Sequence, residues 1–304
     1  IPGSIKKLVI FNNQSLGGEL PRGNSFDDWK TYIDSQYVPC LSSFIRNNSS
    51  PISALEIWNE PDVQEIPASA FAYMVKAGAS AVKSINPNIA IISGGLGYGI
   101  DYQDRAGDVV YLTDMKTAYP DVFQNIDGVG FHPYCLSPDG WNKPPQGDPW
   151  CSSLYGSISD SIAAFSRISG KEVWITEVGY GTFDTAFQQE YLRRVFTTLK
   201  NRVPVSIWYA WIDTMGAAAQ GPFGLFDERG VIKPSGNTFT LFTSQNINPT
   251  PAPVMLCITD SDCPSDKVCQ LPVCAPIDLE QACSEAVDKV ACERRVEEKE
   301  KLRC

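Results

Sequence analysis

Short apolar segments alternate with longer helix-like segments through the first 245 residues of the chain. The apolar segments are rich in β-branched residues on both faces, which is typical of parallel strands covered on both sides. Strands are expected at residues 8–12, 54–58, 89–94, 128–132, 172–177 and 205–210, with helices at 26–47, 68–85, 109–120, 157–169 and 186–201. This alternation predicts repeated βαβ units, in a (β/α) barrel or a doubly wound sheet. No GxGxxG turn follows the first strand, which disfavours a dinucleotide-binding sheet.

A proline-rich stretch ends this region. Residues 246–256 contain three prolines, which favour an extended spacer. We therefore expect a large α/β domain at 1–245, a linker at 246–256 and a cysteine-rich module at 257–304, with a helix from about Leu279. We favour a structural role for this module, as a disulfide-stabilised unit or a spacer, over a binding function.

Cysteine usage points to an oxidising compartment. Seven of the ten cysteines follow residue 256. The separation of Cys135 and Cys151 suits a disulfide across a long loop that also carries Trp141 and Trp150. That loop would either contribute sugar subsites or pack onto the barrel. Sequence leaves the pairing in the module open; one arrangement joins Cys257 to Cys269 and Cys263 to Cys274. Glycosylation sequons at Asn13, Asn47 and Asn48 agree with an extracellular, secreted protein.

Charge and hydropathy exclude two classes of partner. The net charge is −10, the pI is about 4.7, and no basic block is present, so nucleic acid is not an expected partner. No apolar run reaches the roughly 20 residues that would span a bilayer. The chain begins with Ile1 and carries no signal peptide, so we expect that any export signal has been removed.

Five side chains fall at or just beyond the C-terminal ends of four expected strands. They are Glu60, His132, Tyr134, Glu177 and Trp211. In a (β/α) barrel, that end carries the active site. His132 is the single histidine, which excludes a multi-histidine metal site, and no cofactor is expected. The alternatives are a hydrogen-bonded structural role for His132 and a core position for Trp211.

The two glutamates suit glycoside hydrolysis. Each follows an apolar strand, in ALEIWNE and in VWITE, and strands three apart would bring them face to face across the barrel mouth. One carboxylic acid would protonate the leaving oxygen while the other attacks the anomeric carbon. The plain alternative is that each is a solvated group at a loop or helix start.

The motifs WNEP, FHPY and WITEVGY, each closing a strand, resemble those of clan A glycoside hydrolases, which are retaining (β/α)8-barrel enzymes of the cellulase-like superfamily. GPFGLFDERGVIKPS resembles the segment after the last strand of these enzymes, so the resemblance covers residues 5–245. It implies Glu60 as acid/base, Glu177 as nucleophile, and Asn59 as the residue that binds the sugar 2-hydroxyl. His132 and Tyr134 would be supporting residues, and Trp211, or else Trp208, the sugar platform.

The chain departs from this family at its start. One expected strand precedes Glu60, where the family has three, so strands 1 and 2 are missing and no residue takes the role of the strand 2 arginine. An open parallel barrel would leave unpaired edges, so we expect a second polypeptide to supply the two strands. The predicted function is a secreted retaining β-glycosidase acting on a polysaccharide or oligosaccharide. The alternative is a non-catalytic carbohydrate-binding or matrix protein built on the same barrel.

Overall fold

A computed structural model of the chain gives the arrangement of its strands and helices. It describes residues 6–12, 20–21, 25–48, 52–97, 101–102, 105–134, 150–152, 156–213, 221–244, 267–270 and 273–276. The chain divides into two compact units, Ile1–Thr240 and Leu241–Cys304. The candidate site residues that the structure describes all belong to the first unit.

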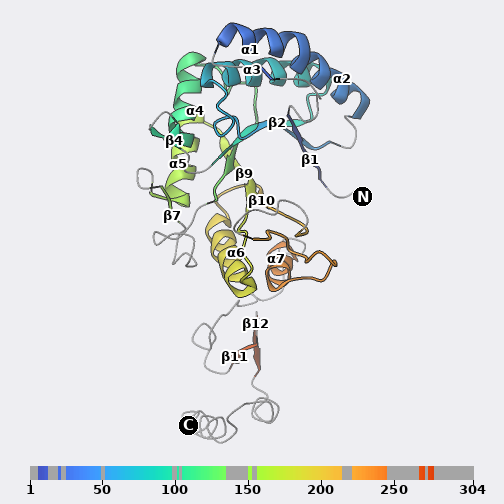
Figure 1. Cartoon of the computed structure of the whole chain (residues 1–304), viewed down its shortest axis with the longest axis vertical. Coiled ribbons are helices and arrows are strands. Elements are labelled where there is room, and N and C mark those ends of the chain that lie inside the picture. The colour runs from blue at the N-terminus through green and yellow to red at the C-terminus, as the bar shows by residue number, and fades with distance from the viewer. Residues whose placement is uncertain are drawn as a thin grey trace, which may run out of the picture. The chain divides into compact units, whose positions relative to one another are not determined.

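The first unit is built on a parallel sheet of six strands, in the order β1-β2-β3-β6-β9-β10 (Figure 1). Every neighbouring pair in this sheet is parallel. The strands are β1 (Leu8–Phe11), β2 (Ala54–Asn59), β3 (Ala90–Gly97), β6 (Gly128–His132), β9 (Glu172–Val178) and β10 (Ser206–Trp208). All six strands expected from the sequence are therefore present, with ends that shift by up to three residues. Strand β6 is buried along its whole length, as a strand covered on both faces should be.

Helices cover the outer face of this sheet. They are α1 (Phe26–Tyr32), α2 (Val38–Asn48), α3 (Ala68–Ile85), α4 (Gly107–Ala118), α5 (Ile158–Ser169), α6 (Thr185–Leu199) and α7 (Pro234–Ser244). Helices α2 to α6 contact one another in chain order, so they follow the strands around the sheet. Helix α3 buries Phe71, Val75, Ala79 and Val82, whose spacing of three to four residues places them on one face. This is a partial-barrel α/β fold of the TIM type.

The helix expected at residues 26–47 is interrupted. A π-helical turn, Ile33–Tyr37, separates α1 from α2, and the backbone N–H of Val38 donates to the carbonyl of Ile33. Pro39 explains the interruption, because it has no N–H to donate to the carbonyl four residues earlier. The apolar periodicity predicted the helix but not this local change.

Short antiparallel pairs lie outside the main sheet. β4 (Asp101–Tyr102) pairs with β5 (Arg105–Ala106), and β7 (Trp150–Ser152) pairs with β8 (Gly156–Ser157). These pairs were not predicted, because strands of two or three residues carry no usable periodicity.

The second unit contains one strand pair, β11 (Lys267–Gln270) with β12 (Val273–Pro276), among the residues that the structure describes. Its register sets Cys269 opposite Cys274. The expected linker at 246–256, the helix from Leu279, and the predicted partners Cys257 and Cys263 lie outside the described residues. None of the helices in the described part of the chain has the length and apolar character needed to span a membrane.

Strands β1 and β10 form the two edges of the six-stranded sheet. The assignment of these edges to strands 3 and 8 of a closed barrel, with strands 1 and 2 between them, stays a prediction. The supply of those strands by a second polypeptide stays a prediction.

A buried ion pair holds the segment that follows β10. Lys233 Nζ lies 2.9 Å from Asp213 Oδ1, and the same oxygen accepts a hydrogen bond from the backbone N–H of Gly224. Both charged side chains are at least nine-tenths buried, with exposed fractions of 8% and 10%. The pair therefore ties residues 221–233 to the end of β10.

Removing one member of this pair should destabilise the domain. Lys233→Met leaves Asp213 buried without its cation, so we expect the free energy of unfolding to fall by about 3–5 kcal/mol. Urea denaturation at neutral pH measures the change. The double variant Asp213→Leu, Lys233→Met should recover most of the loss, and an equally unstable double variant would contradict this account.

Candidate active site

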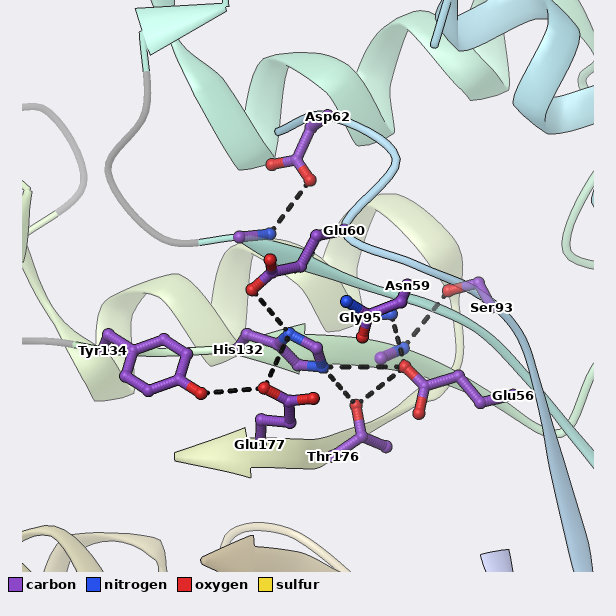
Figure 2. Close-up of polar contacts among 12 residues, drawn as sticks. Glu56, Asn59, Glu60, Asp62, Ser93, Gly95, His132, Tyr134, Thr176 and Glu177 are labelled. Atoms are coloured by element: carbon purple, nitrogen blue, oxygen red, sulfur yellow. Dashed lines mark hydrogen bonds and ion pairs between the residues drawn. The ribbon is translucent and has the colours of Figure 1, made fainter. Parts of the chain in front are cut away.

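Side chains from three strands meet at the C-terminal edge of the sheet (Figure 2). Glu60 directly follows β2, His132 ends β6, Tyr134 lies two residues beyond it, and Glu177 lies near the end of β9. One ligand atom from each of Glu60, His132 and Glu177 lies within 4.8 Å of the other two. The structure thus brings together four of the residues that the sequence singled out.

His132 lies at the centre of the cluster and is fully buried. Its Nδ1 is 3.0 Å from Glu60 Oε1, and its Nε2 is 3.0 Å from the hydroxyl of Thr176. Gly95 on β3 makes room for the ring, because a Cβ at this position would lie 2.0 Å from Nε2. Neighbouring strands therefore fix the position and the orientation of the imidazole.

Carboxylates surround His132 and keep it charged. Burial lowers the pKa of His132, but contacts with Glu56 and Glu60 and the charge of Glu177 outweigh burial and raise it to about 10. At neutral pH the ring is therefore an imidazolium ion.

Glu177 is held from two sides. The hydroxyl of Tyr134 donates a hydrogen bond of 2.8 Å to Glu177 Oε2, and the same oxygen lies 3.8 Å from His132 Nδ1. Burial raises the pKa of Glu177. The positive charge of His132 and the hydrogen bond from Tyr134 lower this pKa, and the negative charge of Glu60 raises it. The net effect is a pKa above the usual value of 4.5. The side chain is 18% exposed, so one part of it reaches the surface of the site.

The backbone around Glu60 departs from regular strand geometry. Trp58 has a φ of 72° and Glu60 a φ of 46°, both in the left-handed region that residues with a side chain rarely adopt. Such conformations cost of order 1–3 kcal/mol each and persist where the surrounding structure enforces them. Here the N–H of Glu60 donates to the carbonyl of Gly95, and the turn directs the Glu60 carboxylate towards His132.

Two polar residues of the cluster were not predicted. Glu56, inside β2, is fully buried and accepts hydrogen bonds at Oε1 from the N–H of Gly95, at 2.5 Å, and from the hydroxyl of Thr176, at 2.9 Å. A charged residue inside the apolar run ALEIW was a usable signal, because a buried charge is costly without a partner. Thr176 carried no such signal, since threonine is a common strand residue.

The aromatic residues around β10 are arranged differently from expectation. Trp208 is buried against Tyr191 and Phe196, and its indole N–H donates to the carbonyl of Phe223. No face of this ring is free for a sugar, which corrects its expected role as the alternative platform. Trp211 is 62% exposed and packs against Phe226, with ring centroids 4.7 Å apart and the ring planes tilted by 39°.

A third aromatic residue, Tyr209, follows Trp208 in this segment. Burial raises its pKa, and the charges of Glu177 and then Glu60 add to the increase. Its hydroxyl therefore lies within electrostatic reach of both carboxylates. Tyr209 was not predicted, because the two neighbouring tryptophans were the stronger signal for a sugar platform.

The candidate glycosylation and disulfide residues are not among those that the structure places in this cluster. Asn47 and Asn48 are exposed in the last turn of α2, and their glycosylation stays a prediction. Asn13, Cys135 and Trp141 lie outside the described residues, and so do the side chains of Trp150 and Cys151.

The cluster could bring three ligand atoms to a metal ion, from Glu60, His132 and Glu177. Both ring nitrogens of His132 already face oxygen atoms, however, and an imidazolium ion has no lone pair to offer. A cation at this position would have to displace the proton on Nδ1.

A family profile described as Cellulase (glycosyl hydrolase family 5) matches residues 41–214 of the chain. The chain belongs to this family. The matched residues begin within α2, continue beyond β10, and include Glu60, His132 and Glu177.

Solved structures are similar to the chain, and the first of the two below shares its fold. The family 5 chain is similar to a family 39 glycoside hydrolase from Bacteroides cellulosilyticus WH2, with a TM-score of 0.56 and 20% identity over 83% of this chain and 53% of that one. It thus spans about half of that structure's length. An endo-β-1,4-mannanase from Thermotoga petrophila has a TM-score of 0.47 and 16% identity, over 84% of this chain and 61% of that one. No curated protein matches the chain.

Neutralising Glu177 should stabilise the folded family 5 domain at neutral pH. Its folded-state pKa lies above the unfolded value, so its ionisation destabilises the fold as pH rises through this window. We expect Glu177→Gln to have a higher Tm than the wild type at about pH 7 and a smaller advantage near pH 4, measured by calorimetry.

Asp160→Asn provides a control of opposite sign. Hydrogen bonds from Ser157 lower the pKa of Asp160, so this substitution should lower the Tm at neutral pH. A Tm difference for Glu177→Gln that does not vary with pH would show that the ionisation of Glu177 is not its cause.

Proposed function

We propose that this family 5 chain is a retaining β-glycoside hydrolase that cleaves a polysaccharide or oligosaccharide through a two-glutamate double displacement. The short separation of Glu60 and Glu177 carries the proposal. One oxygen of each lies within 4.8 Å of the other. Retaining enzymes have carboxyl groups about 5–5.5 Å apart, whereas inverting enzymes need roughly 6.5–9.5 Å to admit a water molecule.

Glu177 is the proposed nucleophile. Its contacts with the Tyr134 hydroxyl and His132 hold Oε2, so the carboxylate is oriented before a sugar arrives. Attack on the anomeric carbon forms a glycosyl-enzyme ester and breaks the glycosidic bond. Neutralisation of Glu177 in the ester also removes one of the charges that face His132.

Glu60 is the proposed acid/base. It gives a proton to the leaving oxygen, and in the second step it takes one from the water that hydrolyses the ester. His132 Nδ1, 3.0 Å from Glu60 Oε1, holds the carboxyl group in place during both transfers. With an exposed fraction of 25%, the side chain is accessible to a substrate.

Asn59 and the aromatic residues after β10 are the proposed sugar contacts. Asn59 Oδ1 is buried and has no hydrogen-bond partner within the described part of the chain, which suits an acceptor for a sugar hydroxyl. Trp211 offers an exposed ring, and Tyr209 lies within electrostatic reach of both glutamates. Aromatic faces stack on the apolar faces of sugars.

We also propose that the protein is secreted, on the strength of its ten cysteines and its sequons. The disulfides Cys135–Cys151 and those of the C-terminal module belong to the same proposal.

A non-catalytic carbohydrate-binding or matrix protein is the second candidate. The observation that favours it is that, within the described residues, strands β1 and β10 each pair on one side only. Assay of the purified protein on β-glucans, mannans and xylans, with analysis of the products, separates the two candidates. Binding without any product would support the second.

Substitution of the two glutamates should affect turnover differently. Glu177→Gln should abolish turnover on every substrate, because no glycosyl-enzyme can form. Glu60→Ala should lose about 10²–10⁴-fold on natural substrates but retain activity on aryl glycosides whose leaving groups need little protonation. Steady-state kinetics on a series of aryl glycosides measures this, and equal losses on good and poor leaving groups would contradict the assignment.

Trp211→Ala should weaken sugar binding and leave the fold intact. Loss of a stacking ring worth about 0.5–1.5 kcal/mol corresponds to a roughly 2–13-fold increase in the Kd for oligosaccharides, measurable by calorimetric titration. The exposed ring predicts a stability change within about 0.5 kcal/mol. Trp208→Ala is the control, since truncation of a buried tryptophan costs about 3–5 kcal/mol. A comparable loss of stability in Trp211→Ala would mark that residue as part of the core.

A further inference from the structure

Glu56 has no part in the proposed displacement, yet it lies beside the residues that carry it out. It is fully buried in β2, and its Oε1 is 3.7 Å from His132 Nε2. The hydroxyl of Thr176 lies between the two groups, 2.9 Å from Glu56 Oε1 and 3.0 Å from His132 Nε2. A buried carboxylate in this position costs solvation energy and calls for a role.

The hydrogen-bond directions in this chain of groups are constrained. The backbone N–H of Gly95 can only donate, so Glu56 Oε1 is an acceptor at that contact. Thr176 has a single hydroxyl proton, and donating it to the Glu56 carboxylate leaves the hydroxyl oxygen to accept from His132. Nε2 must then carry a proton. The opposite direction would require both a protonated Glu56 and an unprotonated Nε2.

The charges around the His132 ring favour donation from Nε2 to Thr176 and from Thr176 to Glu56. His132 faces Glu56 and Glu60 from β2, Glu177 from β9, and Tyr134 from its own strand segment. These contacts raise the pKa of His132 to about 10 although burial opposes them, so both ring nitrogens are protonated at neutral pH. The proton on Nδ1 points to Glu60 Oε1.

We propose that Glu56 is a positioning residue that acts through Thr176 to keep Nε2 of His132 protonated, so that the Nδ1 proton is shared with the acid/base Glu60. The proposal rests on the function proposed above for Glu60. Glu56 touches neither the sugar nor the reacting atoms in this scheme. It supplies a fixed negative charge beneath the ring, and this charge keeps a proton available next to the group that must deliver one.

The single histidine makes the proposal directly measurable. In the full chain labelled with ¹⁵N, the two imidazole nitrogens give signals from His132 alone, and a pH titration reports its protonation state without any turnover. We expect the wild-type ring to stay doubly protonated well above pH 7. In Glu56→Gln, which removes the charge but keeps an oxygen for Gly95 and Thr176, the titration should move down by at least about one pH unit.

Two substitutions at Thr176 separate the hydroxyl from the charge. Thr176→Val removes the bridge and leaves Nε2–H without its acceptor, so the titration should move in the same direction by less than in Glu56→Gln. Thr176→Ser restores the hydroxyl and should restore the wild-type titration. This pair decides the outcome even if Glu56→Gln does not fold. Asp108→Asn, which removes a buried carboxylate at the start of α4, is the control for loss of a buried charge and should leave the His132 titration unchanged.

Activity supplies an independent arm. If Glu60 shares the proton, the basic limb of kcat/KM should move to lower pH in Glu56→Gln by an amount similar to the NMR shift, because His132 loses its proton more readily once a nearby negative charge is gone. An unchanged His132 titration in both Glu56→Gln and Thr176→Val would overturn the proposal. A shifted titration in a protein without hydrolase activity would instead overturn the proposed function and leave the link between Glu56 and His132 standing.

Discussion

The charged imidazole of His132 holds the centre of this site together. Three carboxylates approach it from β2 and β9, and without a cation between them their mutual repulsion would force them apart or force one to bind a proton. The sheet makes this arrangement possible, because parallel strands present their C-terminal ends at one edge. The helices outside the sheet matter to the chemistry indirectly, since they hold these strands in register.

The six strands could be predicted from the sequence because each is a short apolar run bounded by polar or turn residues. Glu60, His132, Tyr134 and Glu177 could be predicted for a related reason: each breaks the apolar pattern at the end of a strand. The π-helical turn before Pro39 could not, because it depends on one missing backbone donor and leaves the apolar periodicity unchanged.

The remainder of the site depends on contacts that only the folded chain defines. Thr176 matters because β9 places its hydroxyl between Glu56 and His132, and nothing in the local sequence distinguishes it from other strand threonines. In the segment Trp208-Tyr209-Ala210-Trp211, residue type favoured the tryptophans, but Trp208 is buried in the core and Tyr209 lies within electrostatic reach of the glutamates. The sequence therefore does not predict which side chains of such a short segment are buried and which reach the site.

The absence of a side chain at Gly95 has a consequence for how this protein can vary. The His132 ring occupies the volume that a Cβ at position 95 would need. The backbone N–H of Gly95 also donates a hydrogen bond to Glu56 Oε1. A larger residue at 95 is therefore compatible with the fold only if the residue at 132 is smaller than histidine, and that change removes the cation. The dependence runs one way in the fold: while His132 is present, a library that randomises position 95 would return almost nothing but glycine, whereas a smaller residue at 132 fits beside Gly95 but forfeits the cation.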